Sequence, residues 1–278
     1  MAYARARALV TMEHESVHPG GLCVARTIAV ANQKGGVGKT TTVINLAAYL
    51  ADAGQRVLAV DSDPQGNTTT GLGIDKSVID ASLYEVLIGD QTVLDALLPT
   101  SVVGLHLVPG ALDLAGAEVE LLNESDRAMR LRRAIQPIVD RYDYVFIDCP
   151  PSLGVLTINA LAAADAVLIP LQCEFFALEG LAQLLSTIDL VRTRINPELE
   201  LEGLVLTMYD GRTNLAQQVA QEVRSHFGEK VFRSVIPRTV RLSEAPSYGQ
   251  PILRYDPRSK AAEVYRSLAK EMLLNAAK

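Results

Sequence analysis

Features typical of secreted and membrane-spanning proteins are scarce in this sequence. Its 278 residues include no tryptophan, only 5% aromatic residues and three cysteines. Cys23, Cys149 and Cys173 are odd in number and form no C-x-x-C pair, which argues against a disulfide framework or a zinc site within one chain. The most apolar stretch, residues 155–171, is interrupted by polar residues and a proline, whereas a bilayer span needs about 20 consecutive apolar residues. We therefore expect no membrane insertion and a location in the reducing cytoplasm.

The remaining composition is that of a globular chain with an uneven charge distribution. Hydrophobic residues make up 49% and charged residues 21%, and the mean hydropathy is +0.17. The net charge is −6, yet residues 192–258 contain ten Lys or Arg and eight Asp or Glu, a local net charge of +2. The composition is therefore compatible with a local basic surface on an acidic protein, which has to be argued from particular residues.

The first 26 residues do not have the pattern of a signal peptide. Arg5 and Arg7 are followed by acidic residues such as Glu13, where a signal peptide needs an apolar core. We expect residues 1–26 to be a disordered extension, or sequence upstream of a true start at Met12. Residues 27–278 are expected to form one domain, since no linker, repeat or low-complexity tract divides them.

Strand-like and helix-like segments alternate along this domain. A β-rich run at residues 27–31, a helical stretch at 40–53 and a second apolar run at 56–60 predict a βαβ unit with parallel strands. Further strands are expected at 105–108, 144–147, 166–169 and 204–208, and helices near 82–88, 153–164, 178–194, 213–227 and 259–276. The sequence predicts an α/β fold: a mostly parallel, doubly wound sheet with helices on both faces.

A glycine-rich loop lies between the first expected strand and helix. It consists of Gln33, Lys34, Gly35, Gly36, Val37, Gly38, Lys39, Thr40 and Thr41. Its glycines allow backbone N–H groups to surround phosphate oxygens, and the helix N-terminus adds the favourable end of its dipole. Lys39 is expected to meet the β- and γ-phosphates, Thr40 to offer its hydroxyl to Mg²⁺, and Thr41 to hydrogen-bond the α-phosphate. The strand–loop–helix context favours this phosphate-binding loop over a simple glycine-rich turn.

The loop departs from the general phosphate-loop pattern at its start. Gln33 occupies the place of the first glycine, and Lys34 brings a second lysine. Since Lys39 already serves one phosphate cluster, Lys34 has either a solvated surface role or a second nucleotide to reach. Sequence spacing does not distinguish the two.

Three aspartates follow expected strands. Asp61 and Asp63 come after the second strand, at the carboxyl edge where the phosphate loop also lies. Strand alternation would place both on one side, close enough to share Mg²⁺ and water, although the same residues also make a well-capped turn. Asp148 ends a later apolar strand and is expected to hold Mg²⁺ through a water, and the adjacent Cys149 is expected to be a packing residue.

The motifs at residues 34–41, 60–67 and 147–152 resemble the three ATP-site motifs of the deviant Walker A ATPases (the MinD/ParA superfamily), and most of all the ParA/Soj chromosome-partitioning group. The resemblance extends over 27–278 and includes matching segments at 177–180, 207–210, 236–238 and 242–246. It implies a P-loop NTPase-like fold, an ATPase with a slow intrinsic rate that uses ATP and Mg²⁺, and a homodimer that encloses two ATP molecules.

The resemblance also implies residue roles at the nucleotide. Lys34 would cross to the phosphates of the partner protomer, Asp63 would orient the attacking water, and Asp61 would lie near the loop lysine and the metal. The adenine would lie near Pro237 and Thr239, with Met208 as a wall. Relatives often have asparagine where Thr239 stands, so a backbone contact would survive this difference better than a side-chain contact.

Arg212 and Arg241 match the basic residues with which ATP-bound dimers of this group bind double-stranded DNA without sequence preference. On the sequence alone, each is an isolated arginine for which a surface ion pair is the simpler interpretation. The resemblance favours DNA contacts, a nucleoid-associated protein, and hydrolysis stimulated by a ParB/Spo0J-type centromere-binding partner. Chromosome and plasmid partition are not distinguished by these motifs.

Two other relatives of the same superfamily make alternative predictions. A MinD-like membrane-associated cell-division regulator would carry an amphipathic C-terminal anchor, and Val264, Leu268 and Met272 do form a helical stripe. Because no Trp or Phe accompanies them, we expect a helix that docks on the domain. An iron–sulfur relative would need two suitably placed cysteines, a pattern that Cys149 and Cys173 do not show.

Overall fold

The computed structural model describes residues 25–276, and its core is a seven-stranded sheet in the order β3-β4-β2-β5-β1-β6-β7. The strands are β1 (Arg26–Val30), β2 (Val57–Asp61), β3 (Leu98–Pro99), β4 (Leu105–Val108), β5 (Tyr144–Asp148), β6 (Ala166–Gln172) and β7 (Glu200–Thr207). All neighbours are parallel except β3, which pairs antiparallel with β4. The expected α/β fold with a mostly parallel sheet is confirmed. The extension expected over residues 1–26 falls on residues outside the described range, apart from Ala25 and Arg26.

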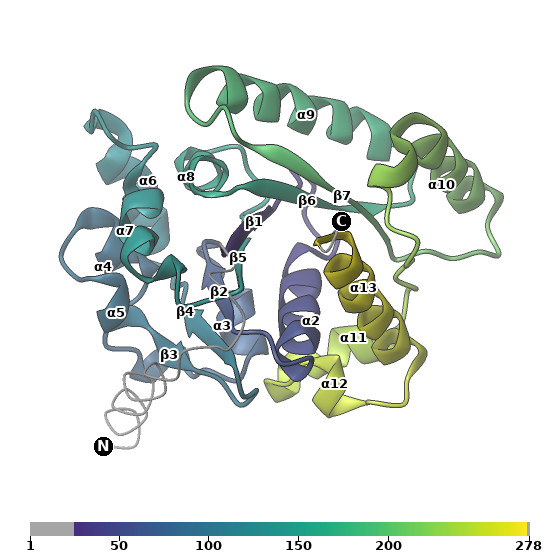
Figure 1. Cartoon of the computed structure of the whole chain (residues 1–278), viewed down its shortest axis with the longest axis horizontal. Coiled ribbons are helices and arrows are strands. Elements are labelled where there is room, and N and C mark those ends of the chain that lie inside the picture. The colour runs from purple at the N-terminus through teal and green to yellow at the C-terminus, as the bar shows by residue number, and fades with distance from the viewer. Residues whose placement is uncertain (1–24, 277–278) are drawn as a thin grey trace.

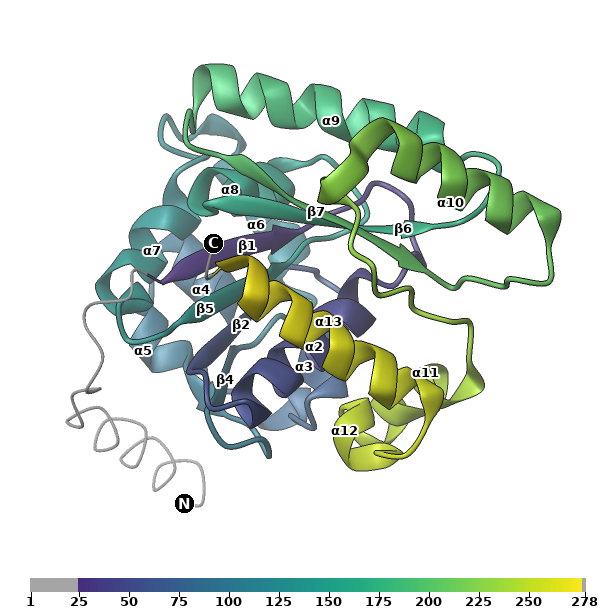
Figure 2. The same ribbon diagram turned by 45° about the vertical axis from the view of Figure 1, so that its right-hand side comes forward.

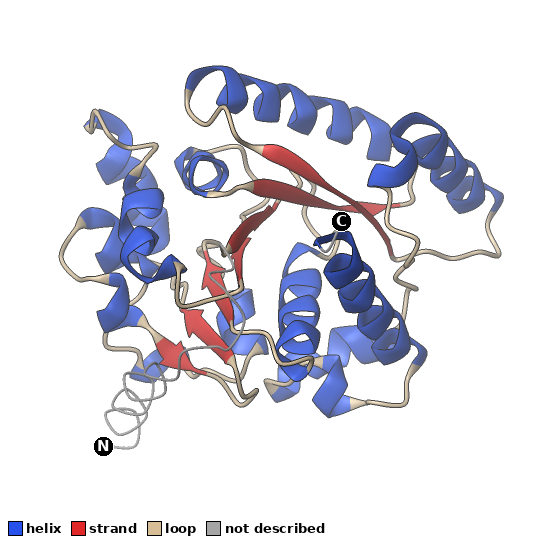
Figure 3. Cartoon of the chain, in the orientation of Figure 1, coloured by secondary structure: helices blue, strands red, loops and turns tan. Residues whose placement is uncertain are grey.

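Helices connect the strands and cover both faces of the sheet (Figures 1 and 3). They are α2 (Lys39–Asp52), α3 (Asn67–Gly71), α4 (Leu83–Ile88), α5 (Val93–Ala96), α6 (Leu114–Glu120), α7 (Arg130–Val139), α8 (Val155–Ala163), α9 (Ala177–Arg194), α10 (Asn214–Phe227), α11 (Val240–Glu244), α12 (Ile252–Tyr255) and α13 (Lys260–Ala276). Figure 2 shows α9 and α10 on one side of the sheet and α2 and α13 on the other.

Two apolar cores lie on the two faces because successive side chains of a strand point to opposite sides. In β5, Tyr144 and Phe146 pack with α2 and α13, whereas Val145 and Ile147 pack with α4 to α10. A strand that is buried on both faces has a continuous run of apolar residues, and such runs are the pattern from which the sequence predicted these strands. The parallel arrangement brings the carboxyl ends of β1, β2, β5, β6 and β7 to one edge of the sheet.

The C-terminal helix α13 docks on the domain, as expected. Leu268 and Met272 are buried against the core that includes α2, and Val264 is partly buried there. The stripe that an amphipathic anchor would present to a membrane is therefore in contact with protein. Of the helices within residues 25–276, none has the length and apolar composition that a bilayer span requires.

Helix α7 is the longest element that the sequence pattern did not predict. Its buried side chains are Leu131, Ile135 and Ile138, an i, i+4, i+7 pattern that arginines and Pro137 interrupt in the sequence. Because Pro137 lies in the last turn, the helix keeps most of its hydrogen bonds and ends two residues later.

Candidate functional site

The glycine-rich loop joins β1 to α2 at the carboxyl edge of the sheet. Gly36 and Gly38 have φ angles of 74° and 89°, a conformation that side chains with a Cβ disfavour. Gly38 is the N-cap of α2 and brings no capping side chain, so the first N–H groups of the helix remain available to an anion. The loop therefore has the backbone geometry of a phosphate cradle.

Neighbouring strands hold this loop in place from both ends. Asn32 donates from its amide to the Pro170 carbonyl (2.8 Å) and accepts from the Lys34 N–H (3.0 Å). At the other end, the Thr207 hydroxyl donates to the Val37 carbonyl (2.8 Å). The ends of β6 and β7 thus fix the cradle, although they lie more than 130 residues away along the chain.

Lys39 is a buried cation at the first position of α2. Its side chain donates to the Lys34 carbonyl (3.2 Å), and the residue is 6% exposed. Burial lowers the pKa of Lys39, and the nearby charge of Asp148 partly opposes this shift. A buried ammonium group at a helix N-terminus is electrostatically unfavourable, and bound phosphate oxygens would add to the compensation that Asp148 provides.

Asp148 at the end of β5 has the contacts expected of a cation ligand. One carboxylate oxygen, Oδ2, accepts hydrogen bonds from the hydroxyls of Thr40 and Thr68, both at 2.7 Å. The other oxygen, Oδ1, is buried without a hydrogen-bond partner. Burial, followed by the charge of Asp61, raises the pKa of Asp148 to about 7. An unpartnered carboxylate oxygen beside a threonine hydroxyl fits a hard divalent cation such as Mg²⁺.

The described residues, 25–276, contain no cluster of three His, Cys, Asp or Glu side chains able to hold a metal by themselves. In nucleotide sites Mg²⁺ has few protein ligands, and phosphate oxygens and water supply the others. The donor set of Thr40 and Asp148 therefore suits a metal that arrives with a phosphate ligand.

Asp61 lies directly beside Asp148, since the two residues are paired across β2 and β5. It is fully buried, and its Oδ2 accepts from the backbone N–H and the hydroxyl of Thr69, both at 2.7 Å. Burial raises the pKa of Asp61 to about 6, and the hydrogen bonds from Thr69 offset part of this shift. Two buried carboxylates side by side repel each other when both are charged, and a bound cation would relieve this repulsion.

Asp63 begins the turn that leads from β2 to α3. Its Oδ1 accepts from the Gln65 N–H (2.9 Å), and the residue is 7% exposed. The capped turn that the sequence allowed is present, and it fixes the carboxylate at the same edge as Asp61.

The side chain of Lys34 forms an ion pair with Glu174 of the same chain. Glu174 follows the end of β6 and also accepts from the amide of Gln172. Both charged side chains are exposed by more than two-fifths, so solvent weakens the pair. Lys34 is accessible at the molecular surface, while Lys39 of the same loop is buried.

The residues expected near an adenine lie together beyond the end of β7. Met208 has a φ of 49° and is the only described non-glycine residue with a positive φ. The next residue, Tyr209, pairs with Pro237 in an isolated bridge. The Thr239 hydroxyl caps α11 by accepting from the Arg241 N–H (3.3 Å). Since Thr207 contacts the phosphate loop, this segment is continuous with the cradle.

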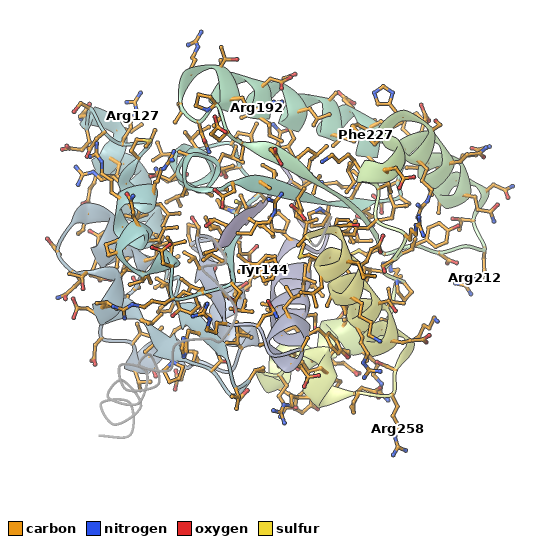
Figure 4. The ribbon with its side chains drawn as sticks, viewed as in Figure 1. Arg127, Tyr144, Arg192, Arg212, Phe227 and Arg258 are labelled. Atoms are coloured by element: carbon orange, nitrogen blue, oxygen red, sulfur yellow. The ribbon has the colours of Figure 1, made fainter. Side chains whose placement is uncertain are left out.

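Arg212 and Arg241 both lie on the surface and both form ion pairs within the chain. Arg212 makes a two-point contact with Asp210 (2.8 and 2.7 Å), and its hydrogen bonds lower the pKa of Asp210 to about 2. Arg241 contacts Glu244 (3.2 Å) and Asp256 (3.3 Å). Figure 4 shows Arg212 at the outer edge of the molecule near α10. Each arginine keeps an exposed guanidinium despite its carboxylate neighbours.

The expected site residues are oriented by side chains that the sequence pattern did not predict. They are Asn32, Thr68, Thr69, Glu174 and Thr207. The run of three threonines that begins at Thr68, just after the expected turn, was the one available signal, because hydroxyls close to carboxylates are suitable donors.

We expect Thr69→Val to destabilise this edge of the sheet. The Thr69 hydroxyl donates to buried Asp61 and accepts from the Gly110 N–H (2.9 Å), so its removal leaves two buried polar groups short of a partner. The free energy of unfolding should fall by about 1–3 kcal/mol, measured by urea denaturation of the nucleotide-free protein. Thr69→Ser keeps the hydroxyl and should lose less, and equal losses in the two variants would contradict the hydrogen-bond account.

The sequence is similar to curated proteins of chromosome partition. A family model described as an AAA domain matches residues 25–201. The sporulation initiation inhibitor protein Soj of Bacillus subtilis is 56% identical over 252 residues, which are 91% of this chain and 100% of Soj. The chromosome partitioning protein ParA of Caulobacter vibrioides is 56% identical over 250 residues, covering 89% of this chain and 94% of ParA.

Solved structures share the fold. A Mycobacterium smegmatis protein described as cobyrinic acid a,c-diamide synthase, with bound ATP analogue and magnesium, has a TM-score of 0.81 and 43% identity, covering 92% of this chain and 97% of that one. The cell division ATPase MinD of Pyrococcus furiosus has a TM-score of 0.75 and 29% identity, covering 90% of this chain and 99% of that one. These neighbours confirm the expected P-loop NTPase-like fold.

Proposed function

Because this chain belongs to the ParA/Soj family of chromosome-partitioning ATPases, we propose that it hydrolyses ATP to regulate its own dimerisation on DNA. In this cycle ATP closes a homodimer, the dimer binds double-stranded DNA without sequence preference, and hydrolysis releases it. The observation that best supports the proposal is the arrangement of Lys39, Thr40 and Asp148 around a cradle of free backbone N–H groups.

ATP and Mg²⁺ are the proposed ligands of this site. The backbone N–H groups of Gly35, Gly36, Val37 and Gly38 would surround the phosphates, and Thr41 would bond the α-phosphate. Thr40 and Asp148 would hold Mg²⁺, with Asp61 contributing its charge beside them. When bound, the metal neutralises charge on the phosphates. Met208, Pro237 and Thr239 would flank the adenine.

Hydrolysis in this proposal needs no covalent intermediate. Lys39 and the loop N–H groups stabilise the charge that develops on the phosphoryl oxygens, and Asp63 orients a water for in-line attack. Because Asp63 is held by the turn that it caps, its carboxylate is positioned before the nucleotide binds.

Lys34 is proposed to act on the nucleotide of the partner protomer. Its exposed ammonium group is bound only by a solvent-weakened ion pair with Glu174, so moving it to a triphosphate costs little. Hydrolysis would then require dimerisation. A ParB/Spo0J-type centromere-binding protein is the proposed partner that stimulates this step.

Arg212 and Arg241 are the proposed DNA contacts. Two copies of each arginine in a dimer would supply at least four cations for phosphate groups, whereas a monomer has half of them. Both arginines stay charged, but the carboxylates that pair with them partly offset the local positive potential, so we expect weak, salt-sensitive binding that needs the dimer. Such binding to chromosomal DNA would make the protein nucleoid-associated.

The MinD-like alternative has less support. It needs an amphipathic anchor, but Leu268 and Met272 of α13 are buried against the domain. A synthase activity also has less support. The Mycobacterium smegmatis protein with that name is 43% identical to this chain, whereas the Soj and ParA relatives are 56% identical.

Binding to random-sequence duplex DNA tests the proposal. The Asp63→Ala variant is used so that ATP persists, and its affinity for DNA is compared with ATP and with ADP at low salt. We expect binding with ATP only, a decrease as salt is raised, with a slope of about −0.9 per phosphate contacted, and loss of binding on Arg241→Ala.

Arg192→Ala is the matched control for this experiment. Arg192 is an exposed arginine of α9, and Figure 4 shows it well apart from Arg212. Arg192→Ala should bind DNA with an affinity within about twofold of that of the protein without this change, since the loss of one surface charge away from the DNA contacts has a small effect. Absence of binding with both nucleotides would overturn the DNA-partition function, and anionic liposomes would then test the MinD-like alternative.

A further inference from the structure

Asn45 is a buried polar side chain in the middle of α2. Its Nδ2 donates to the Thr41 carbonyl one turn earlier (2.8 Å), and its Oδ1 accepts from the Ile252 N–H (2.7 Å). Ile252 is the first residue of α12, whose N-cap, Pro251, supplies no capping side chain. Asn45 therefore satisfies one of the N–H groups that a helix start leaves without an intrahelical partner. One side chain thus joins the proposed α-phosphate ligand to a helix that begins 207 positions after Asn45.

A second contact joins the same region of the chain to the nucleotide site. Gly73 and Gly249 touch through their backbones: a Cβ built on Gly249 would lie 2.6 Å from the Gly73 Cα, and one built on Gly73 would lie 2.8 Å from the Gly249 carbonyl oxygen. Their φ angles are 83° and 62°, so both positions require glycine. Gly73 lies two residues after α3, whose threonine hydroxyls bind the two buried aspartates of the site.

Residues 239–255, here called the α11–α12 segment, are held together by their own side chains. Glu244 accepts from the guanidinium of Arg241 (3.2 Å) and from the hydroxyl of Tyr255 (3.0 Å). The ring of Tyr248 stacks on that of Tyr255, with centroids 5.1 Å apart. At the end of the segment, α12 packs against α2 and α13 (Figure 2). The position of Arg241 is therefore set by the segment as a whole.

A nucleotide in the proposed site would touch both α2 and this segment. Thr41 of α2 is the proposed α-phosphate ligand, and Thr239, the first residue of the segment, is proposed to flank the adenine. Asn45 holds the segment where Thr239 can meet the adenine, since it binds α2 and α12 at the same time. A ligand that adds an attachment point between two elements restrains their relative motion. Arg212, by contrast, pairs with Asp210 outside the segment.

We propose that the α11–α12 segment is a nucleotide-responsive element and that Asn45 is the positioning residue that attaches it to the nucleotide site. Bound nucleotide stabilises the segment and fixes Arg241, whereas Arg212 does not depend on Asn45. Because the adenine and the α-phosphate are the groups concerned, the response does not need the γ-phosphate. The inference rests on the proposed function for the nucleotide and DNA contacts, and it separates the positioning of Arg241 from dimerisation.

Hydrogen exchange measured by mass spectrometry tests the attachment without DNA. The full chain is compared nucleotide-free and saturated with Mg·ADP, which has the adenine and the α-phosphate of ATP. We expect Mg·ADP to slow exchange in residues 239–255 at least about fivefold in the unmodified chain, and Asn45→Ala to lose most of this slowing. Residues 212–227, which begin with Arg212, should respond equally in the two proteins.

Asn159→Ala is the matched control, because Asn159 of α8 makes the same pattern of bonds as Asn45. It is buried, its Nδ2 donates to the Val155 carbonyl one turn earlier (2.9 Å), and its Oδ1 accepts from the Leu131 N–H in the first turn of α7 (3.1 Å). Its removal leaves comparable buried groups without a partner but does not touch residues 239–255. Asn159→Ala should therefore keep the slowing by Mg·ADP.

A second pair of variants tests the glycine contact. Gly249→Ala should also lose the slowing, because the added methyl group pushes the segment away from Gly73. Gly228→Ala is its control: Gly228 has a similar φ of 53°, and a Cβ there would meet no atom within 4 Å. Both variants carry the strain of a positive φ, and only Gly249→Ala disturbs the contact.

DNA binding is measured on the Asp63→Ala background with ATP. Adding Asn45→Ala should weaken binding at least about fivefold while sedimentation still shows the ATP dimer, because Arg241 is no longer held in place. Adding Asn159→Ala should keep the affinity.

Two results would overturn the nucleotide-responsive segment: no slowing of exchange by Mg·ADP in the unmodified chain, or the same slowing in Asn45→Ala and Asn159→Ala. If Asn45→Ala does not fold, the comparison of Gly249→Ala with Gly228→Ala decides in the same way. Absence of DNA binding by Asp63→Ala with ATP would instead overturn the proposed function, while the exchange result would still decide the segment.

Discussion

Asp148→Asn is expected to reduce ATP turnover at least about 100-fold, equivalent to about 2.7 kcal/mol of barrier. In the structure, Asp148 receives two hydroxyl donors on one oxygen and leaves the other buried without a partner. The amide keeps the shape of the carboxylate but removes the charge that would hold Mg²⁺ beside Thr40. Turnover is measured by phosphate release over a range of Mg²⁺ concentrations, where the variant should need far more metal.

Magnesium removal and a matched substitution make this prediction specific. Chelation by EDTA should bring the wild type down to the level of Asp148→Asn, because both remove the same neutralising charge. Asp165→Asn is the control: Asp165 binds the Thr27 N–H (2.8 Å) at the opposite edge of the sheet and should leave turnover unchanged. Wild-type turnover by Asp148→Asn at low Mg²⁺ would show that this residue is not the metal ligand.

Lys34→Ala should have the second large effect. If Lys34 acts on the partner's phosphates as an arginine finger does, its removal costs about 10³- to 10⁵-fold in turnover, or about 4–7 kcal/mol. The same change should have little effect on stability, because the Lys34–Glu174 pair is exposed. Phosphate release measures turnover, and sedimentation with ATP measures dimerisation. Full activity in Lys34→Ala would show that Lys34 does not act on the partner's phosphates.

Mixed dimers distinguish action across the interface from action within a protomer. Lys34→Ala keeps an intact metal site, and Asp148→Asn keeps Lys34. If Lys34 crosses to the partner, mixing the two inactive proteins creates one complete site and restores part of the activity. No recovery in a mixture that forms dimers would place Lys34 on its own nucleotide. Glu174→Gln is the control, since it frees Lys34 without removing it and should keep turnover.

The sequence predicted the parts of this protein that depend on local pattern. Strands β1, β2 and β5 are buried on both faces, so each reads as an apolar run, and the glycine-rich loop falls between a strand and a helix. Given parallel strands, the carboxyl ends meet at one edge, which is why Asp61 and Asp148 could be expected together before their pairing was seen.

Helices α6 and α7 show where local pattern was insufficient. In α7 the apolar positions are interrupted by arginines and Pro137, and in α6 apolar residues occur on both the buried and the exposed face. Periodicity identifies a helix by a single apolar stripe against a polar background. When charges interrupt the stripe, or an apolar residue also lies on the exposed face, the signal weakens even though the helix forms by packing against its neighbours.

By itself, the sequence determined the α/β sheet, the phosphate loop and the identity of the residues at its edge, because these follow from periodicity and from glycine's backbone freedom. Only the tertiary structure decided which groups orient these residues. Thr68 donates to Asp148, Thr69 donates to Asp61, and Glu174 forms an ion pair with Lys34. These contacts join residues from 8 to 140 positions apart. Hydrogen bonds act over about 3 Å, so they are set by how the strands and loops pack, which no local pattern encodes.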